Sequence, residues 1–478
     1  MVLLQMPGRR LWIGNCSISC KNPISDGMYQ VRILVNQIVY NYAENVSALM
    51  SISITDTYCE FEREPLANPF GFKGGYLKEI WQTAVLLKSD DQLSGIGLGC
   101  QSVLWSDRRI FVSASESGGN SLMFAITDKA LQLAKGRSFD TPIDLLNQLF
   151  PEVYAYAQGI TGLPDLNMTF VMNALVAIDN AAWILYAKHH GIKNFDELIP
   201  EKYRPALSYR HDQVACVPIA SYGMSIHDIK QLVNRQGYFV LKIKIGSPGG
   251  QQEMLENDKK RFEQIHQAIG ETKSQYTKNG LIPYYLDING RYESKELLKQ
   301  FLDHAEKIGA MNQIFLLEEP FPEEYTAHVD DLGITIVADE SAHTADNVKE
   351  RIEMGYGAMA LKPIVKTLSM TFEMAKIAYE YNTPCFCADL TVNPVLVDWN
   401  KNVAARLTTI PGINTGLLET NGHQNYKYWK EMLDYHPDPD ASWVQSRNGV
   451  FNLDKSFYKK SGGIFEDLPH YRSILMPQ

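Results

Sequence analysis

Residues 314–341 read IFLLEEPFPEEYTAHVDDLGITIVADES, two short apolar runs that each end in carboxylates. Runs of this kind recur through the second half of the chain, separated by amphipathic helical stretches. The eight runs are 216–223, 238–246, 282–290, 314–320, 334–341, 358–364, 384–390 and 414–420. Eight strand–helix units in series predict an α/β fold with a closed parallel (β/α)8-type barrel. A doubly wound open sheet is the alternative, but residues 220–223, ASYG, lack its Gly-rich phosphate turn.

The first part of the chain has a different pattern. Residues 50–63 and 79–99 are rich in β-branched and aromatic residues and predict strands, and residues 120–192 are helical in character. Between the two strands, residues 64–77 (EPLANPFGFKGGYL) predict a loop with apolar tips, either packed on the surface or closing on a ligand as a flap. We therefore expect an α+β region before the barrel.

Two further segments stand apart from the barrel pattern. Residues 270–281, GETKSQYTKNGL, form a polar insertion before the third barrel strand. Near the end, residues 446–454, SRNGVFNLD, predict a hairpin that leaves the barrel.

Composition excludes several classes of protein. The chain has 478 residues, of which 45% are hydrophobic and 21% charged, as in a soluble globular protein. The net charge of −10 argues against nucleic-acid binding, and no run reaches the ~18 apolar residues of a membrane span. The seven cysteines lack the spacing of a zinc or redox motif, and positive charge follows the first apolar residues instead of preceding them. These features predict a cytoplasmic protein.

Charged residues gather at the carboxyl ends of the predicted strands. Lys242 and Lys244 alternate with apolar residues, so both side chains face one side of the second strand. The ends of strands three to six carry, in chain order, Asp287 and Asn289, Glu318 and Glu319, Asp339 and Glu340, and Lys362. In a barrel these ends converge on one mouth, where active sites form.

This set of residues suits one kind of chemistry. Carboxylates from three adjacent strands would repel one another unless a divalent cation lay between them, and an all-oxygen set suits Mg²⁺. A lysine in a cationic, desolvated site can have a pKa low enough for it to act as a base. Together the groups could remove a proton from carbon next to a carboxylate and stabilise the enediolate that forms.

At this point the sequence resembles the enolase superfamily, most closely its muconate-lactonizing and dipeptide-epimerase branch. The segments that carry the resemblance are LKIKIG at 241–246, LDIN at 286–289, LEEPF at 317–321, VADES at 337–341 and ALKP at 360–363. The resemblance implies a capping domain, built from residues 1–205 and a tail at 426–478 that packs back on it, over a catalytic barrel at 206–425.

The resemblance also implies roles for individual residues. It makes Asp287, Glu318 and Asp339 the Mg²⁺ ligands. Lys244 and Lys362 would be acid or base on opposite faces of the substrate, and Lys242 would stabilise its carboxylate. The remaining substrate contacts would come from Asn289, from Phe70 and Lys73 in the predicted flap, and from Asp389 and Glu419 after strands seven and eight. His423 would lie at the same specificity end.

Departures from the family pattern leave the substrate open. Where the branch usually has a Gly-Gly pair after the sixth-strand lysine, this chain has Lys366-Thr367-Leu368-Ser369. Strand seven carries Cys385, Cys387 and Asp389 and lacks the histidine of the mandelate-racemase branch. We expect a racemase, epimerase or cycloisomerase acting on a small carboxylic acid, with acid-sugar dehydration and carboxylate binding without turnover as alternatives. A homo-oligomer is left open.

Overall fold

A computed structural model describes residues 4–6, 9–11, 51–72 and 75–476. The chain divides into two units, residues 1–51 and residues 52–478. In the first unit, β1 (Leu4–Met6) and β2 (Arg9–Leu11) form an antiparallel ribbon.

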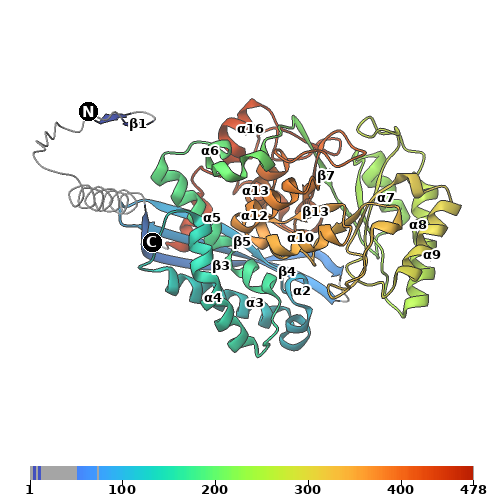
Figure 1. Ribbon diagram of the computed structural model, residues 1–478, viewed down its shortest axis with the longest axis horizontal. Helices are drawn as coiled ribbons and strands as arrows, with labels where there is room; N and C mark the ends of the chain where they lie inside the picture. Colours follow the sequence, from blue (N-terminus) through green and yellow to red (C-terminus); the bar gives the residue numbers. More distant parts are fainter. Residues whose placement is uncertain (1–3, 7–8, 12–50, 73–74, 477–478) are drawn as a thin grey trace, which may run out of the picture. The chain divides into compact units, whose positions relative to one another are not determined.

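A closed barrel of parallel strands forms the second half of the chain, as the sequence predicted (Figure 1). Its strands are β7 (Gln213–Val217), β8 (Ile219–Ala220), β9 (Leu241–Lys244), β10 (Tyr284–Asp287), β11 (Ile314–Glu318), β12 (Ile336–Ala338), β13 (Ala358–Leu361), β14 (Cys385–Cys387) and β15 (Gly416–Glu419). The first strand is interrupted at Pro218, which has no N–H to donate. Its β7 half pairs with β15 and its β8 half pairs with β9, so the two halves together close the sheet.

The inward-facing side chains change character along the barrel. At the amino end they are apolar, because Tyr285, Leu316, Val337 and Phe386 form a core of their own inside the barrel. Two residues further along each of β10 and β11, the same face carries Asp287 and Glu318. The charged residues therefore stand on an apolar floor at the carboxyl end of the strands.

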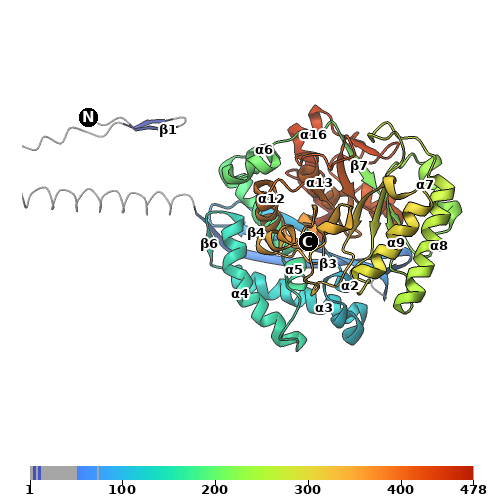
Figure 2. The same ribbon diagram turned by 45° about the vertical axis from the view of Figure 1, so that its right-hand side comes forward.

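Helices surround the barrel, and several are prominent in Figure 2. They are α7 (Ile226–Asn234), α8 (Gln251–Ile269), α9 (Lys295–Lys307), α10 (Ala345–Glu353), α11 (Pro363–Lys366), α12 (Leu368–Glu380) and α13 (Pro394–Ala404). Most begin with a side-chain cap of the expected type: Ser225, Ser294, Thr344 and Asn393 each accept a hydrogen bond from the first turn.

The predicted insertion at 270–281 lies at the closed end of the barrel, away from the mouth. It bridges to the segment before β15 through Thr277 and Ile413. The ring of Tyr276 stacks on Phe239 at 4.3 Å between centroids and packs against the inner core. The insertion therefore covers the floor of the barrel.

The α+β region before the barrel is built on an antiparallel sheet with strand order β5-β4-β3-β6. Its strands are β3 (Ile52–Phe72), β4 (Gly75–Ser89), β5 (Ser94–Gln101) and β6 (Ser138–Phe139), and its helices are α2 (Val103–Ser106), α3 (Arg108–Ala134), α4 (Pro142–Thr161), α5 (Met168–His190) and α6 (Phe195–Leu198). A 3-10 helix, Glu201–Leu207, leads into the barrel.

Helix α5 packs closely on β5. Gly95, Gly97 and Gly99 alternate along the strand, and each has backbone or Cβ atoms of α5 where a Cβ would stand. Among the described helices α5 is long and apolar enough to cross a membrane, with a mean hydropathy of 1.5, but 94% of that window is buried inside the protein. Packing in the core accounts for its apolar sequence.

The loop expected at 64–77 was wrong in form, because the two strands continue as a hairpin. Strand β3 runs to Phe72 and β4 begins at Gly75, with Phe70 paired to Leu77. Pro65 and Pro69 are tolerated because β3 is an edge strand over this stretch, and the register shifts between Pro65 and Phe70.

The predicted exit of residues 446–454 from the barrel was also wrong. Strand β16 (Val450–Asn452) pairs antiparallel with β7 and extends the barrel sheet. The reason is the interrupted first strand, since β9 pairs only with the β8 half and leaves one edge of β7 open. The remaining helices are α14 (Gly422–Asn425), α15 (Trp429–Leu433), α16 (Lys455–Lys460) and α17 (Pro469–Leu475), and α17 contacts β3 and β4.

Candidate functional site

Three buried lysines and the carboxylates of neighbouring strands meet at the barrel mouth. Lys242 Nζ lies 3.0 Å from Asp287 Oδ2, 2.9 Å from Glu318 Oε1 and 3.5 Å from Glu419 Oε2. Lys244 contacts Asp287 as well and donates to Asn289 Oδ1 at 2.7 Å.

The third lysine, Lys362, lies on another wall of the mouth. Its Nζ is 2.8 Å from Asp339 Oδ2 and 4.7 Å from the centre of the Trp105 ring. Strands β9 and β13 are four positions apart in a barrel of eight parallel strands, which places Lys244 and Lys362 on opposite walls. The strands that carry Asp287, Glu318 and Asp339 lie on the arc between them.

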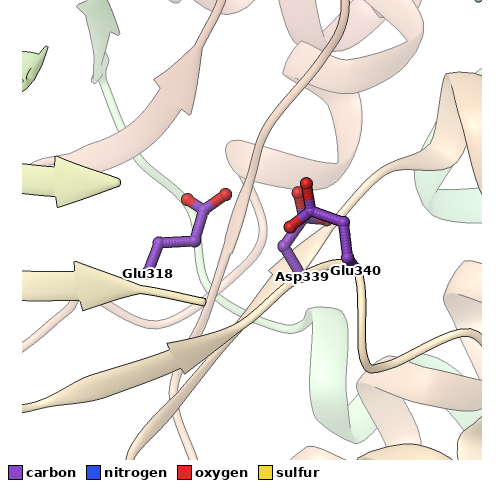
Figure 3. A group of neighbouring side chains, drawn as sticks. All are labelled: Glu318, Asp339 and Glu340. Carbon is purple, nitrogen blue, oxygen red and sulfur yellow. The ribbon is translucent and has the colours of Figure 1, made fainter. Parts of the chain in front are cut away.

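A group of three carboxylates is close enough to share a cation. One oxygen from each of Glu318, Asp339 and Glu340 lies within 4.8 Å of the others, and all three residues are buried (Figure 3). Glu318 Oε2 is buried and accepts no hydrogen bond from the part of the chain that the structure describes. An all-oxygen set of this kind fits a hard divalent cation such as Mg²⁺.

Burial and the neighbouring charges shift the pKa values of these carboxyl groups and of Glu319 in different directions. Burial raises the pKa of Glu318 to about 7, against the opposing effect of Lys242. Burial and the neighbouring Glu340 raise the pKa of Glu319 to about 8. Lys362 and Lys366 outweigh burial at Asp339 and hold its pKa below the usual range.

The expectation of lysines with lowered pKa values is not met at Lys242 and Lys362. Burial lowers the pKa of each, but the surrounding carboxylates raise it by more. The physical reason is that each ammonium group is in direct contact with an anionic partner. A cation that neutralised Asp339 and Glu318 would remove part of this effect, because opposite charges favour the ionised form of a lysine.

The structure gathers most of the predicted site residues around one pocket, which leaves only about 30 Å³ of free volume. The predicted residues that line it are Phe70, Lys242, Lys244, Asp287, Asn289, Asp339, Lys362, Asp389 and Glu419. Glu318 lies beneath them, in contact with Lys242. Lys73 lies outside the described residues. His423 does not line the pocket; it contacts the Tyr238 hydroxyl at 2.9 Å, and burial lowers its pKa to about 4.

Asp389 and Glu419 stand at the end of the pocket formed by strands seven and eight. Both are buried, and burial together with Glu419 raises the pKa of Asp389 well above its usual range. Thr391 and Asn421 line the same end, where the Thr391 hydroxyl donates to Asn421 Oδ1 at 2.7 Å. This end of the pocket can therefore offer both hydrogen-bond donors and acceptors to a ligand.

Sequence reasoning missed Trp105 and assigned no role in the site to Glu340 or Lys366, although it located both residues. Glu340 is the third member of the carboxylate group, although its neighbour Asp339 was identified. Trp105, from α2, covers Lys362 and Lys366, and Lys366 is completely buried beside Asp339. The spacing of Lys362 and Lys366, one helical turn apart, was the available signal for Lys366.

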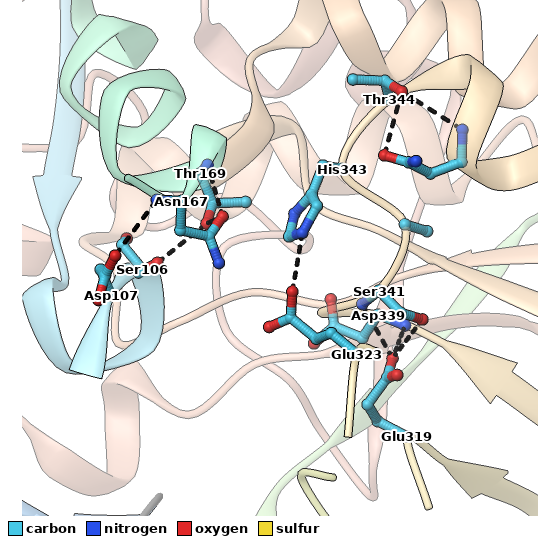
Figure 4. Close-up of polar contacts among 12 residues, drawn as sticks. Ser106, Asp107, Asn167, Thr169, Glu319, Glu323, Asp339, Ser341, His343 and Thr344 are labelled. Carbon is cyan, nitrogen blue, oxygen red and sulfur yellow. Dashed lines mark hydrogen bonds and ion pairs between the residues drawn. The ribbon is translucent and has the colours of Figure 1, made fainter. Parts of the chain in front are cut away.

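A second, wider cleft of about 650 Å³ lies beside the mouth, between α2, α3 and the loops after β10, β11 and β12. Figure 4 shows its walls, with Ser106, Asp107 and Asn167 on one side and His343 on the other. His343 Nε2 contacts Glu323 Oε2 at 2.9 Å. Glu319 and Glu340 line this cleft as well, and Trp105 and Asn289 line both the cleft and the pocket, so the two cavities are adjacent at the carboxylate group.

Ser369, at the start of α12, ties the barrel to α5. Ser369 N donates to Asp179 Oδ2 at 3.1 Å, the Ser369 hydroxyl contacts the other oxygen of Asp179, and Trp183 Nε1 donates to that hydroxyl at 3.1 Å. Asp179 is fully buried, and burial raises its pKa to about 7. Helix α12 is thus anchored on a carboxyl group whose pKa is raised by burial.

This anchor gives the protein a specific pH dependence. Between the ordinary pKa of 3.8 and the folded value of about 7, the folded protein keeps a proton on Asp179 that the unfolded chain releases. The contribution of Asp179 to the free energy of unfolding is therefore fully present below about pH 4 and decreases as the pH rises towards 7. Asp179→Asn, which mimics the protonated acid, should remove this decrease.

Urea unfolding of the wild type and Asp179→Asn across pH 4–7 measures the effect. The stability of the wild type relative to the variant should be greatest at pH 4 and should decline towards pH 7. A difference between the two proteins that stays constant over this range would contradict the assignment.

Comparison with known proteins adds to this geometry. Residues 225–441 match the family described as Enolase C-terminal domain-like. No curated protein matches the chain. Among solved structures, a dipeptide epimerase from Cytophaga hutchinsonii, complexed with Mg and the dipeptide D-Ala-L-Val, is 16% identical with a TM-score of 0.59, over 83% of this chain and 92% of that one.

Two other solved structures show the same fold. A mandelate racemase/muconate lactonizing protein from Herpetosiphon aurantiacus is 15% identical with a TM-score of 0.56, over 84% of this chain and 96% of that one. L-Talarate dehydratase from Polaromonas sp. JS666, complexed with Mg and L-glucarate, is 15% identical with a TM-score of 0.55, over 84% of this chain and 93% of that one. At these identities the likeness establishes the fold.

Proposed function

We propose that the chain belongs, through residues 225–441, to the enolase superfamily, and that it is an Mg²⁺-dependent enzyme that removes a proton from the carbon next to a carboxylate. The reaction that the site favours is racemisation or epimerisation of a small carboxylic acid. The observation that carries this proposal is the placement of Lys244 and Lys362 on opposite walls of the mouth, with the carboxylates between them.

The carboxylates and lysines at the mouth would have different roles in this reaction. Glu318 and Asp339 would hold the cation with a third carboxylate, from Glu340 or Asp287, and the bound Mg²⁺ would stabilise the negative charge that develops on the substrate carboxylate. Lys242, already placed among carboxylates, would donate to the same oxygens. One of Lys244 and Lys362 would remove the proton from one face, and the other would return a proton to the opposite face.

Removal of a proton from one face and return of a proton to the opposite face would invert the configuration of the carbon next to the carboxylate. Cycloisomerisation needs the same enediolate but only one of the two lysines, so it leaves the second lysine without a role. The rest of the substrate would contact other residues that line the pocket. These are Phe70, Asp389 and Glu419.

A second candidate is β-elimination of water, as in acid-sugar dehydration. The observation in its favour is Asp389, a buried carboxyl group on the pocket wall whose pKa is raised by burial and by Glu419. A carboxyl group that keeps its proton at neutral pH can donate it to a departing hydroxyl.

The proposal also includes a cytoplasmic location for the protein. It leaves open whether the chain assembles into a homo-oligomer.

Proton exchange in heavy water tests the proposed function directly. The wild type with Mg²⁺ is incubated with dipeptides, N-acyl amino acids and acid sugars, and deuterium at the carbon next to the carboxylate is followed by NMR. We expect incorporation for at least one class, its loss with EDTA, and its return with Mg²⁺. Formation of a keto acid would identify the dehydratase, and tight calorimetric binding without exchange for every ligand would identify a binding protein.

A further inference from the structure

The turn that carries two of the clustered carboxylates is held from both sides by buried ionisable groups, Glu319 and Lys366. Glu319 Oε2 accepts the N–H of Asp339 at 2.8 Å, and the N–H and hydroxyl of Ser341 at 3.2 and 3.1 Å (Figure 4). On the other side, Lys366 Nζ donates to the carbonyl oxygens of Asp339 at 2.7 Å and Ala342 at 2.9 Å. A carboxyl group thus binds the N–H groups of the turn while an ammonium group binds its carbonyls.

Lys366 also acts on the Asp339 side chain. Its Nζ lies 3.4 Å from Asp339 Oδ1, while Lys362 lies 2.8 Å from Oδ2, so each carboxylate oxygen has its own lysine. The Trp105 ring covers both ammonium groups, at 5.7 Å from Lys366 and 4.7 Å from Lys362. Rotation of Asp339 about its side chain would break one of these contacts.

Lys366 has no access to a substrate. It is fully buried and does not line the pocket at the mouth, whereas Lys242, Lys244 and Lys362 do. Burial of an ammonium group costs several kcal/mol unless its partners compensate. The partners of Lys366 are the backbone of one turn and one carboxylate, which points to a task at that turn.

We infer that Lys366 is a positioning residue that fixes the Asp339–Ala342 turn, so that Asp339 and Glu340 are aimed at the cation site before a cation arrives. The inference rests on the proposed function, because it assumes that these carboxylates hold Mg²⁺. Groups that orient the ligands of a metal typically change its affinity by about 10- to 100-fold when they are removed.

The test is Lys366→Met, which keeps an unbranched apolar side chain and removes the ammonium group. Lys401→Met is the matched control: Lys401 is also fully buried, contacts Asp398, and lies on α13 outside the pocket. Mn²⁺ binding is measured by electron paramagnetic resonance and calorimetry, and unfolding is measured without metal. We expect both variants to lose stability, but only Lys366→Met to lose about 10-fold or more in Mn²⁺ affinity.

A second variant covers the case in which Lys366→Met does not fold. The amide of Lys366→Gln is one atom shorter and uncharged, so it cannot hold both carbonyls, and its Mn²⁺ affinity should lie between those of Lys366→Met and the wild type. Wild-type Mn²⁺ affinity in Lys366→Met, or in Lys366→Gln where the first variant is unfolded, would overturn the inference. Failure of the wild type itself to bind Mn²⁺ would instead overturn the proposed function.

Discussion

Lys362→Ala should stop the incorporation of deuterium from one stereoisomer of the substrate, and Lys244→Ala should stop it from the other. The two lysines project from β9 and β13, on opposite walls of the barrel, so each reaches only one face of a substrate held between them. Loss of a general acid or base typically lowers a rate by about 10²–10⁴-fold. Racemisation, which needs both lysines, should fall by at least that factor in either variant.

The experiment follows deuterium incorporation by NMR for each stereoisomer separately, with Mn²⁺ affinity measured for both variants to separate catalysis from metal binding. Lys376→Ala is the control, since Lys376 lies on the outer helix α12 and pairs with Glu380 at 2.7 Å. Exchange that persists from both stereoisomers in either variant would refute the arrangement of two opposed bases. Loss of exchange in only one of the two variants would favour chemistry with a single base.

Gly97→Ala should destabilise the protein by more than about 3 kcal/mol, beyond the usual range for overpacking. A Cβ at Gly97 would lie 2.1 Å from Ala177 O and 2.2 Å from Ala181 N, both in the backbone of α5. A flexible side chain could move aside, but these atoms belong to a buried 23-residue helix. The helix would have to withdraw from β5 along its length.

Urea unfolding measures this loss, and Gly159→Ala provides the control. Gly159 lies inside α4, and no atom lies within 4 Å of the position that its Cβ would take. Alanine there should stabilise the protein by about 0.5–1 kcal/mol, because it reduces the freedom of the unfolded chain. A Gly97→Ala protein as stable as the wild type would mean that α5 and β5 are packed less closely than described.

The barrel and the main residues of the site could be predicted because they depend on local pattern. Each barrel strand is a short buried run, and polar residues that follow such runs at the carboxyl end must meet at one mouth. That rule placed Lys242, Lys244, Asp287, Asp339 and Lys362 around one pocket without knowledge of any contact.

The rest depends on tertiary contacts that leave no periodic signal. Trp105 comes from the region before the barrel, and Glu340 joins the carboxylate group only because the turn after β12 is held by Glu319 and Lys366. The hairpin at 64–77 was hidden by two prolines, which an edge strand tolerates and a central strand does not. The pKa values of the lysines also required knowledge of which carboxylates they touch.

The interrupted first strand has a consequence for how the chain folds. One edge of β7 is completed by β16, which the ribosome makes only after all the parallel strands of the barrel. Before then, a nascent chain exposes the unpaired edge of a buried strand, and such edges pair readily with other chains. The contact between β7 and β16 also spans most of the barrel in sequence, and contacts of long sequence separation form late and slowly. Synthesis and pairing of β16, more than formation of the strand–helix units, therefore set when this edge of β7 is protected from pairing with other chains.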